Sequence, residues 1–191
     1  LELPADTPLG DPALLLPRLT KLRMVPHGHT ILVPHYHRAR LMAVQQRRHL
    51  TGCDEVVSPL VFQAQGIGRR GWGRQALSMS KGWLRLGLRP FTPWAAVERI
   101  AGAAFVLTGS LHGAILAQAY GIPWAAYDDG YIDAPPKWLD WAAYLGITIK
   151  FVSTLAAGRQ WWQTEGQRGA VRDLQPLLEA FPYPLPTHLR K

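Results

Sequence analysis

The residues best suited to chemistry lie in one short turn, Thr108-Gly109-Ser110-Leu111-His112-Gly113. The turn follows an apolar run typical of a buried strand, 105–107, and precedes a stretch with the pattern of a helix, 111–120. The first N–H groups of a helix lack intrahelical acceptors, and the helix dipole favours an anion beside them. A hydroxyl from Ser110 and an imidazole from His112 would add to these donors, so the turn predicts a cradle for a phosphate or carboxylate. In a simpler interpretation, Ser110 only caps the helix and His112 packs against a neighbour.

Other polar residues are expected at the same edge of the fold. In parallel sheets, ligands bind at the carboxyl ends of the strands. His35 and Arg38 directly follow a second apolar run, 31–33, and are candidates for the same cleft. Gly109 and Gly113 carry no side chain and would let backbone and ligand approach closely.

A further cation and a carboxylate come later in the chain. Lys137 follows two prolines at the start of a predicted helix, 137–145, where a cation is favourable mainly beside a bound anion. Asp140 lies one turn further on and would accept hydrogen bonds from a hydroxyl-bearing ligand. The alternative for both is a solvated side chain on the helix surface.

Two other site classes are not favoured. A zinc site is conceivable from four histidines, but structural zinc sites usually add cysteines at fixed spacing, so we predict no metal; the histidines are His27, His29, His35 and His37. The segment 66–71 has the spacing of a dinucleotide-binding fingerprint. It lacks the preceding strand and the acidic residue that the motif needs, so we predict no nicotinamide cofactor.

Short apolar runs alternate with helical patterns, which predicts an α/β fold with a parallel sheet and helices on both faces. We expect a Pro-rich linker at 1–30, one domain at 31–180 with a flexible Gly/Arg-rich basic insertion at about 63–90, and a tail at 181–191. The predicted strands are 31–33, 55–57, 105–107, 124–127 and 147–152. The predicted helices are 39–50, 92–101, 111–120, 137–145 and 171–181, with a further helical stretch around Trp161 and Trp162.

Composition narrows the class of protein. The 191 residues are 48% hydrophobic and 18% charged, enough to build a core, and no apolar run approaches the length of a membrane span. The net charge of +8 favours an anionic partner: a phosphorylated substrate, an anionic membrane surface or nucleic acid. No basic-aromatic recognition motif is present, so nucleic acid is not predicted. The lone Cys53 indicates a buried thiol and a cytoplasmic location.

Longer stretches resemble a known family. Residues 103–123, which read AAFVLTGSLHGAILAQAYGIP, resemble the signature of polysaccharide pyruvyl transferases, of the type that adds ketal pyruvate to bacterial exopolysaccharides. Lys137 and the pair Asp140-Trp141 are similar to a downstream motif of that family, and 9–16 and 31–38 are similar to upstream segments. In all, the resemblance covers about 9–60 and 90–152.

The resemblance implies two Rossmann-like halves that face a cleft, as in GT-B glycosyltransferases, with this chain as the carboxyl-terminal half. The opening Leu-Glu-Leu-Pro, without an initiator methionine or signal-peptide pattern, fits a chain whose first half lies elsewhere.

The resemblance to this family also implies a reaction and the roles of several residues. A sugar hydroxyl attacks the enol carbon of phosphoenolpyruvate, phosphate leaves, and a second hydroxyl closes a cyclic ketal. His112 would be the acid, Asp140 would contact the acceptor, and the donor would be held by Ser110, Gly113, Lys137, His35 and Arg38. The partners implied are phosphoenolpyruvate and a saccharide, with a lipid-linked precursor presented at the inner face of the membrane. Two alternatives stay open: a GT-B glycosyltransferase that uses a nucleotide sugar, and a non-catalytic binding module of the same fold.

Overall fold

The fold is built on a parallel β-sheet. The computed structural model describes residues 9–22, 25–35, 51–57, 94–128, 130–186 and 189. Within them a sheet of five strands has the order β2-β1-β3-β4-β5, and every neighbouring pair is parallel. The strands are β1 (Thr30–Val33), β2 (Glu55–Val56), β3 (Phe105–Thr108), β4 (Trp124–Tyr127) and β5 (Phe151–Val152).

The three central strands are buried along their whole length. All residues of β1, β3 and β4 are buried. The register sets Thr108 opposite Val33 on one side and Ala126 on the other, so the carboxyl ends of these strands lie together. A sheet covered on both faces needs apolar side chains pointing both ways, which explains the continuous apolar runs in the sequence.

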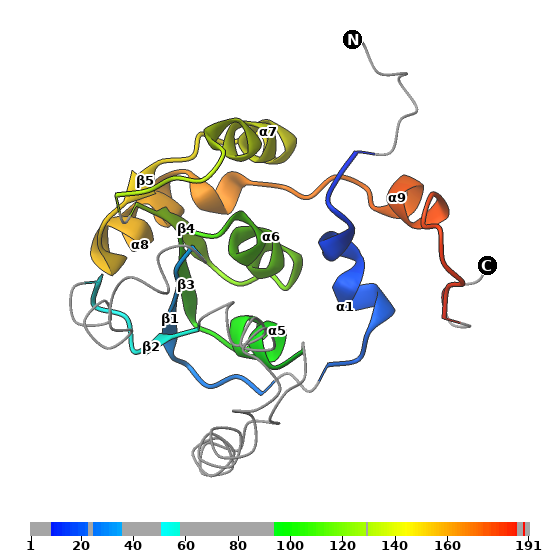
Figure 1. Cartoon of the computed structure of the whole chain (residues 1–191), viewed down its shortest axis with the longest axis horizontal. Coiled ribbons are helices and arrows are strands. Elements are labelled where there is room, and N and C mark those ends of the chain that lie inside the picture. Colours follow the sequence, from blue (N-terminus) through cyan, green and yellow to red (C-terminus); the bar gives the residue numbers. More distant parts are fainter. Residues whose placement is uncertain are drawn as a thin grey trace, which may run out of the picture.

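Helices cover both faces of the sheet, as predicted. The described helices are α5 (Trp94–Ala101), α6 (Leu111–Ala119), α7 (Pro135–Leu145), α8 (Leu155–Thr164) and α9 (Gln175–Glu179). A Cβ on Gly113 of α6 would meet Thr108, whereas one on Gly158 of α8 would meet Leu107 and Phe105. Alternate residues of a strand point to opposite faces, so α6 and α8 lie on opposite sides of β3. Figure 1 shows the same arrangement, with α5 on the side of α6.

The amino-terminal stretch is packed into the fold. The 3₁₀ helix η1 (Pro12–Leu15) continues into α1 (Leu16–Leu19) and contacts α6. Leu14 and Leu15 are almost completely buried, and Leu14 belongs to the main hydrophobic core. The stretch 1–30, expected to be a linker, therefore contributes core residues. Whether it also joins a preceding domain stays a prediction.

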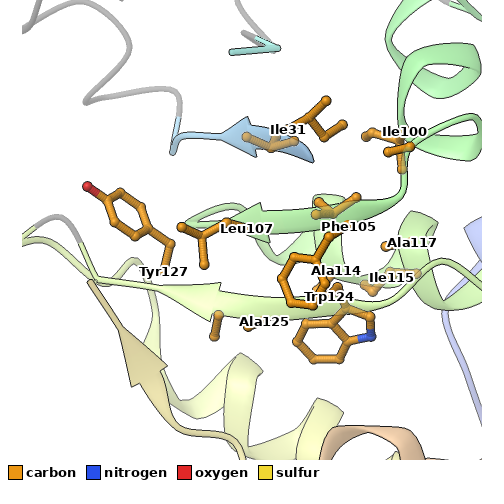
Figure 2. Packing of buried hydrophobic residues seen from close by; sticks show 14 of the residues in the cluster. Ile31, Ile100, Phe105, Leu107, Ala114, Ile115, Ala117, Trp124, Ala125 and Tyr127 are labelled. Atoms are coloured by element: carbon orange, nitrogen blue, oxygen red, sulfur yellow. The ribbon is translucent and has the colours of Figure 1, made fainter. Parts of the chain in front are cut away.

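The core lies between β3, β4 and the helices on either side (Figure 2). Trp124 is fully buried, and its indole N–H donates to Gln118 Oε1 at 2.8 Å. Cys53 is buried as predicted, and this burial raises the pKa of its thiol. Within the described ranges, no helix is long and apolar enough to cross a bilayer.

Two predicted elements differ from the structure. The strand expected at 147–152 forms only at Phe151 and Val152. Just before it, the backbone N–H of Thr148 donates to Glu165 Oε1 and the carbonyl of Thr148 accepts from the indole of Trp161, so side chains replace the sheet as partners. The helix expected over 171–181 is limited to α9.

The ends of the predicted helices 111–120 and 137–145 are more accurate. Gly121 and Gly146, which directly follow these ranges, have φ angles of 67° and 70°, the left-handed conformation that glycine adopts at helix ends. The predicted helix 39–50 and the insertion 63–90 lie outside the described residues. Thr51 and Gly52, which follow that helix, are described.

Candidate functional site

The strand order has its switch point between β1 and β3. The chain passes from β1 to β2 on one side, then returns past β1 to β3 on the other. Open α/β sheets bind ligands where the strand order reverses, outside the carboxyl ends of the strands. Here the N–H of Gly109, just after β3, donates to the carbonyl of Val33 at the end of β1, at 2.9 Å.

Gly109 sits where three strand ends converge. A Cβ at this position would lie 3.3 Å from the backbone nitrogen of His35 and 3.4 Å from the carbonyl oxygen of Tyr127. These residues follow or end β1 and β4, on either side of β3. Glycine thus allows the ends of β1, β3 and β4 to approach one another at the switch point.

Thr108 fixes the turn that follows β3. Its side chain is fully buried, and its Oγ1 accepts from the N–H of Ser110 at 3.0 Å and donates to the carbonyl of Ser110 at 2.8 Å. That carbonyl also accepts from the N–H groups of Gly113 and Ala114, at 2.9 and 3.3 Å. Sequence reasoning singled out Ser110 in this turn, but the hydroxyl that shapes it belongs to Thr108.

The side chains of Ser110 and His112 are not used to cap or pack the helix. Ser110 occupies the N-cap position of α6 with extended backbone, and its side chain makes no capping hydrogen bond. It is half-buried, and His112 is exposed. The interpretation in which Ser110 caps the helix and His112 packs is therefore wrong. Both side chains remain beside the first turn of a helix, whose dipole favours an anion.

Gly113 is used for packing. A Cβ there would lie 2.4 Å from Thr108 Oγ1 and 3.3 Å from Val33 Cγ1. The missing side chain lets α6 lie directly on β1 and β3, which holds the start of the helix at the switch point. The backbone N–H of Gly113 donates to the carbonyl of Ser110. A direct contact between Gly113 and the pyruvyl donor stays a prediction.

His35 is held beside a loop that sequence reasoning missed. The residue is only 6% exposed, and its Nε2 lies 3.5 Å from Asp133 Oδ2. The ring of Tyr131 lies 5.5 Å from the His35 ring, and the Tyr131 hydroxyl donates to Asp133 Oδ1 at 3.4 Å. Because the loop directly follows β4, its place after a strand was the one available signal.

Lys137 and Asp140 lie on exposed positions of α7. Lys137 is in the first turn, and its N–H donates to the carbonyl of Ala134 at 2.9 Å. Ala134, at the N-cap, has a φ of 43°, the left-handed conformation. The loop after β4 brings the start of α7 to the edge that carries His35. Arg38 lies outside the described residues.

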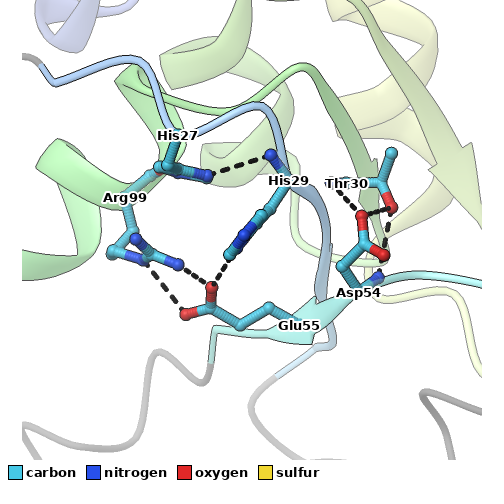
Figure 3. A network of polar contacts seen from close by, with 6 residues as sticks. All are labelled: His27, His29, Thr30, Asp54, Glu55 and Arg99. Carbon is cyan, nitrogen blue, oxygen red and sulfur yellow. Dashed lines mark hydrogen bonds and ion pairs between the residues drawn. The ribbon is translucent and has the colours of Figure 1, made fainter. Parts of the chain in front are cut away.

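His27 and His29 lie at the opposite edge of the sheet (Figure 3). His29 Nδ1 lies 3.6 Å from Glu55 Oε2, and the same carboxylate pairs with Arg99. His27 and His29 precede β1, whereas His35 follows it, so these three do not surround one point. In the described part of the chain, no three His, Cys, Asp or Glu side chains are grouped to hold a metal ion.

Comparison with known proteins gives two matches. The family model described as polysaccharide pyruvyl transferase matches residues 9–131. A curated relative, succinoglycan biosynthesis protein ExoV of Rhizobium meliloti (strain 1021), is 37% identical over 54 residues. That alignment covers 28% of this chain and 17% of the relative, so this chain spans only a small part of it. No solved structure gave a significant match. Since the family model spans well over half of the residues, including β1, β3 and the turn before α6, the chain belongs to the polysaccharide pyruvyl transferase family.

Proposed function

We propose that this chain forms the donor-binding half of an enzyme that transfers the pyruvyl group of phosphoenolpyruvate to a sugar. The product is a pyruvate ketal on a bacterial exopolysaccharide or its lipid-linked precursor. The observation that carries the proposal is the turn at the switch point, where the Ser110 side chain makes no capping hydrogen bond and His112 is exposed, both beside the amino end of α6. The family match and the name of the relative support the same class of reaction.

The proposed substrate, phosphoenolpyruvate, is a dianion or trianion. The chain offers hydrogen-bond donors and cations suited to such a ligand. The amino end of α6 and the Ser110 hydroxyl would bind phosphate or carboxylate oxygens. Lys137 and His35 would add charge from the neighbouring strand ends, as would Arg38. The net charge of +8 favours the approach of such a ligand. No metal or organic cofactor enters the proposal.

His112 is proposed as the general acid. The imidazolium of His112 gives its proton to the methylene carbon of phosphoenolpyruvate while a sugar hydroxyl oxygen bonds to the enol carbon. The hydroxyl proton passes to a base or to solvent. The C–O bond to phosphate then breaks, and a second hydroxyl bonds to the same carbon and loses its proton, closing the ketal. Asp140 is proposed to bind an acceptor hydroxyl.

The complete enzyme is proposed to have the GT-B arrangement of two Rossmann-like halves. The acceptor is proposed to meet this chain across the cleft, in a cytoplasmic setting at the inner face of the membrane. The basic insertion is proposed to contact anionic lipid there.

Substitution of His112 tests the proposal. In the intact protein, His112→Gln keeps a hydrogen-bonding group but removes the transferable proton. We expect pyruvyl transfer from phosphoenolpyruvate to fall by about 10²- to 10⁴-fold, as for loss of a general acid. Because His112 is exposed, the melting temperature should barely change.

His29→Gln is the matched control, because it removes a histidine that lies before β1 at the far edge of the sheet. This variant should transfer pyruvate at the wild-type rate. Near-normal turnover in His112→Gln would show that His112 is not the acid. An intact wild-type protein that neither binds phosphoenolpyruvate nor consumes it, but binds a nucleotide sugar, would refute the proposed reaction.

A further inference from the structure

The loop between β4 and α7 reaches past β3 to the end of β1, where the carboxylate of Asp133 contacts His35. Asp133 Oδ2 lies 3.5 Å from Nε2 of His35, and Asp133 Oδ1 accepts from the hydroxyl of Tyr131. The Asp133 side chain is 43% exposed, whereas that of His35 is 7% exposed. His35 follows a buried strand directly, so it is the fixed member of the pair. The carboxylate is the member that attaches the loop.

The residue after Asp133 has a backbone conformation that needs support. Ala134 has φ 43° and ψ 67°, and it is followed by Pro135. An L-residue rarely adopts the left-handed region, and such a residue persists when its surroundings hold it. The contact between His35 and Asp133 is one residue away and supplies a restraint.

The same residue sets the start of α7. The carbonyl of Ala134 accepts from the N–H of Lys137 at 2.9 Å, in the first turn of the helix. The path from β1 to Lys137 thus runs through His35, Asp133 and the Ala134 carbonyl. Two residues on this path, His35 and Lys137, come from different elements, and both are proposed to bind the pyruvyl donor.

We propose that Asp133 is a positioning residue that, by pairing with His35, holds the loop Gly130–Ala134 against the end of β1. In this way it sets the place of Lys137 relative to the turn that carries His112. The role in donor binding rests on the function proposed above, whereas the attachment of the loop does not. Asp133 does not exchange a proton or a bond with the substrate.

The test combines hydrogen exchange with kinetics in the intact protein. Asp133→Asn keeps the size of the side chain but removes its charge, and Asp133→Ala removes both. We expect faster exchange of the Lys137 amide in both variants, more in the alanine variant. The KM for phosphoenolpyruvate should rise, and kcat/KM should fall by up to about 10²-fold if the ligands are misplaced by an ångström. Asp133→Glu should restore part of the lost affinity.

Glu55→Gln is the matched control. It removes the charge from the other histidine–carboxylate pair of β1, in which His29 Nδ1 lies 3.6 Å from Glu55 Oε2, at the opposite end of the strand. It should leave both the exchange of the Lys137 amide and the KM unchanged. Each variant is compared under conditions where circular dichroism shows it folded.

The outcomes separate the two proposals. Unchanged exchange of the Lys137 amide in Asp133→Ala overturns the positioning role, and so does equal acceleration in Glu55→Gln. Faster exchange with an unchanged KM overturns its part in donor binding. If the exchange behaves as expected but wild-type protein does not bind phosphoenolpyruvate, the loop attachment stands and the proposed function fails.

Discussion

The protonation state of His27 is set by two backbone contacts. Its Nδ1 accepts from the N–H of His29 at 3.1 Å, so the proton must lie on Nε2, which donates to the carbonyl of Arg99 at 2.9 Å. Burial lowers the pKa of His27, and the nearby charges of Arg99 and His29 lower it further, against the raising effect of the bond to the Arg99 carbonyl. Protonation of Nδ1 would remove the acceptor for His29 (Figure 3).

The stability of the fold should therefore depend on His27 in acid. A histidine in an unfolded chain has a pKa of about 6.5, and the pKa of His27 in the folded protein is lower. The unfolded chain then binds more protons, so stability falls as the pH drops below 6.5, until the folded form is also protonated. His27→Asn should be less stable than wild type at pH 8 but lose less stability between pH 7 and pH 5.

Urea unfolding across this pH range measures the effect. Equal slopes for wild type and His27→Asn would contradict the assignment.

The packing of helix α6 on the sheet depends on the absence of a side chain at Gly113. Gly113→Ala would place a Cβ 2.4 Å from Thr108 Oγ1, so the helix or the threonine must move. Overpacking of this kind costs typically about 1–3 kcal/mol of unfolding free energy. The change also shifts the turn that carries His112, so we expect donor affinity to fall together with stability.

A double-mutant cycle tests the cause. Thr108→Ala removes the Oγ1 that the new methyl group would meet, although it also loses the bonds that fix Ser110. The double variant Gly113→Ala with Thr108→Ala should be more stable than the sum of the two single effects predicts. Strict additivity would mean that the clash is not with Thr108.

The elements also show where the sequence was informative. Apolar runs and glycine stops identified β3, α6, β4 and α7 with ends within one or two residues, because local pattern and burial agree there. The expected strand at 147–152 was too long because Glu165 and Trp161 bind the backbone of Thr148 from a distant part of the sequence. Tertiary partners of this kind leave no local pattern.

Across the whole molecule, the parallel fold followed from the alternation of strands and helices, and so did the place of Ser110 and His112. The pairing of His35 with Asp133 did not, because it joins the ends of β1 and β4, which the chain brings together only through the sheet order. The polar loop after β4 has no periodicity, so nothing in its sequence marks Asp133 or Tyr131. The packing role of Gly113 was likewise hidden, since it depends on the position of Thr108.

The strand order also determines the sequence separation between the residues that must meet when the centre of the sheet forms. The unit β3–α6–β4 joins strands that follow one another, whereas Thr108 and Val33 at the β1–β3 contact are 75 positions apart. Closing a long loop costs entropy that local contacts avoid, so we expect β3–α6–β4 to be largely formed in the folding transition state and β1 to dock later. Ile115→Val in α6 and Ile31→Val in β1 make the same chemical change at buried sites, each worth about 0.5–1.5 kcal/mol. In stopped-flow experiments the first should mainly slow folding and the second mainly speed unfolding; the reverse pattern would place the nucleus at the β1 edge.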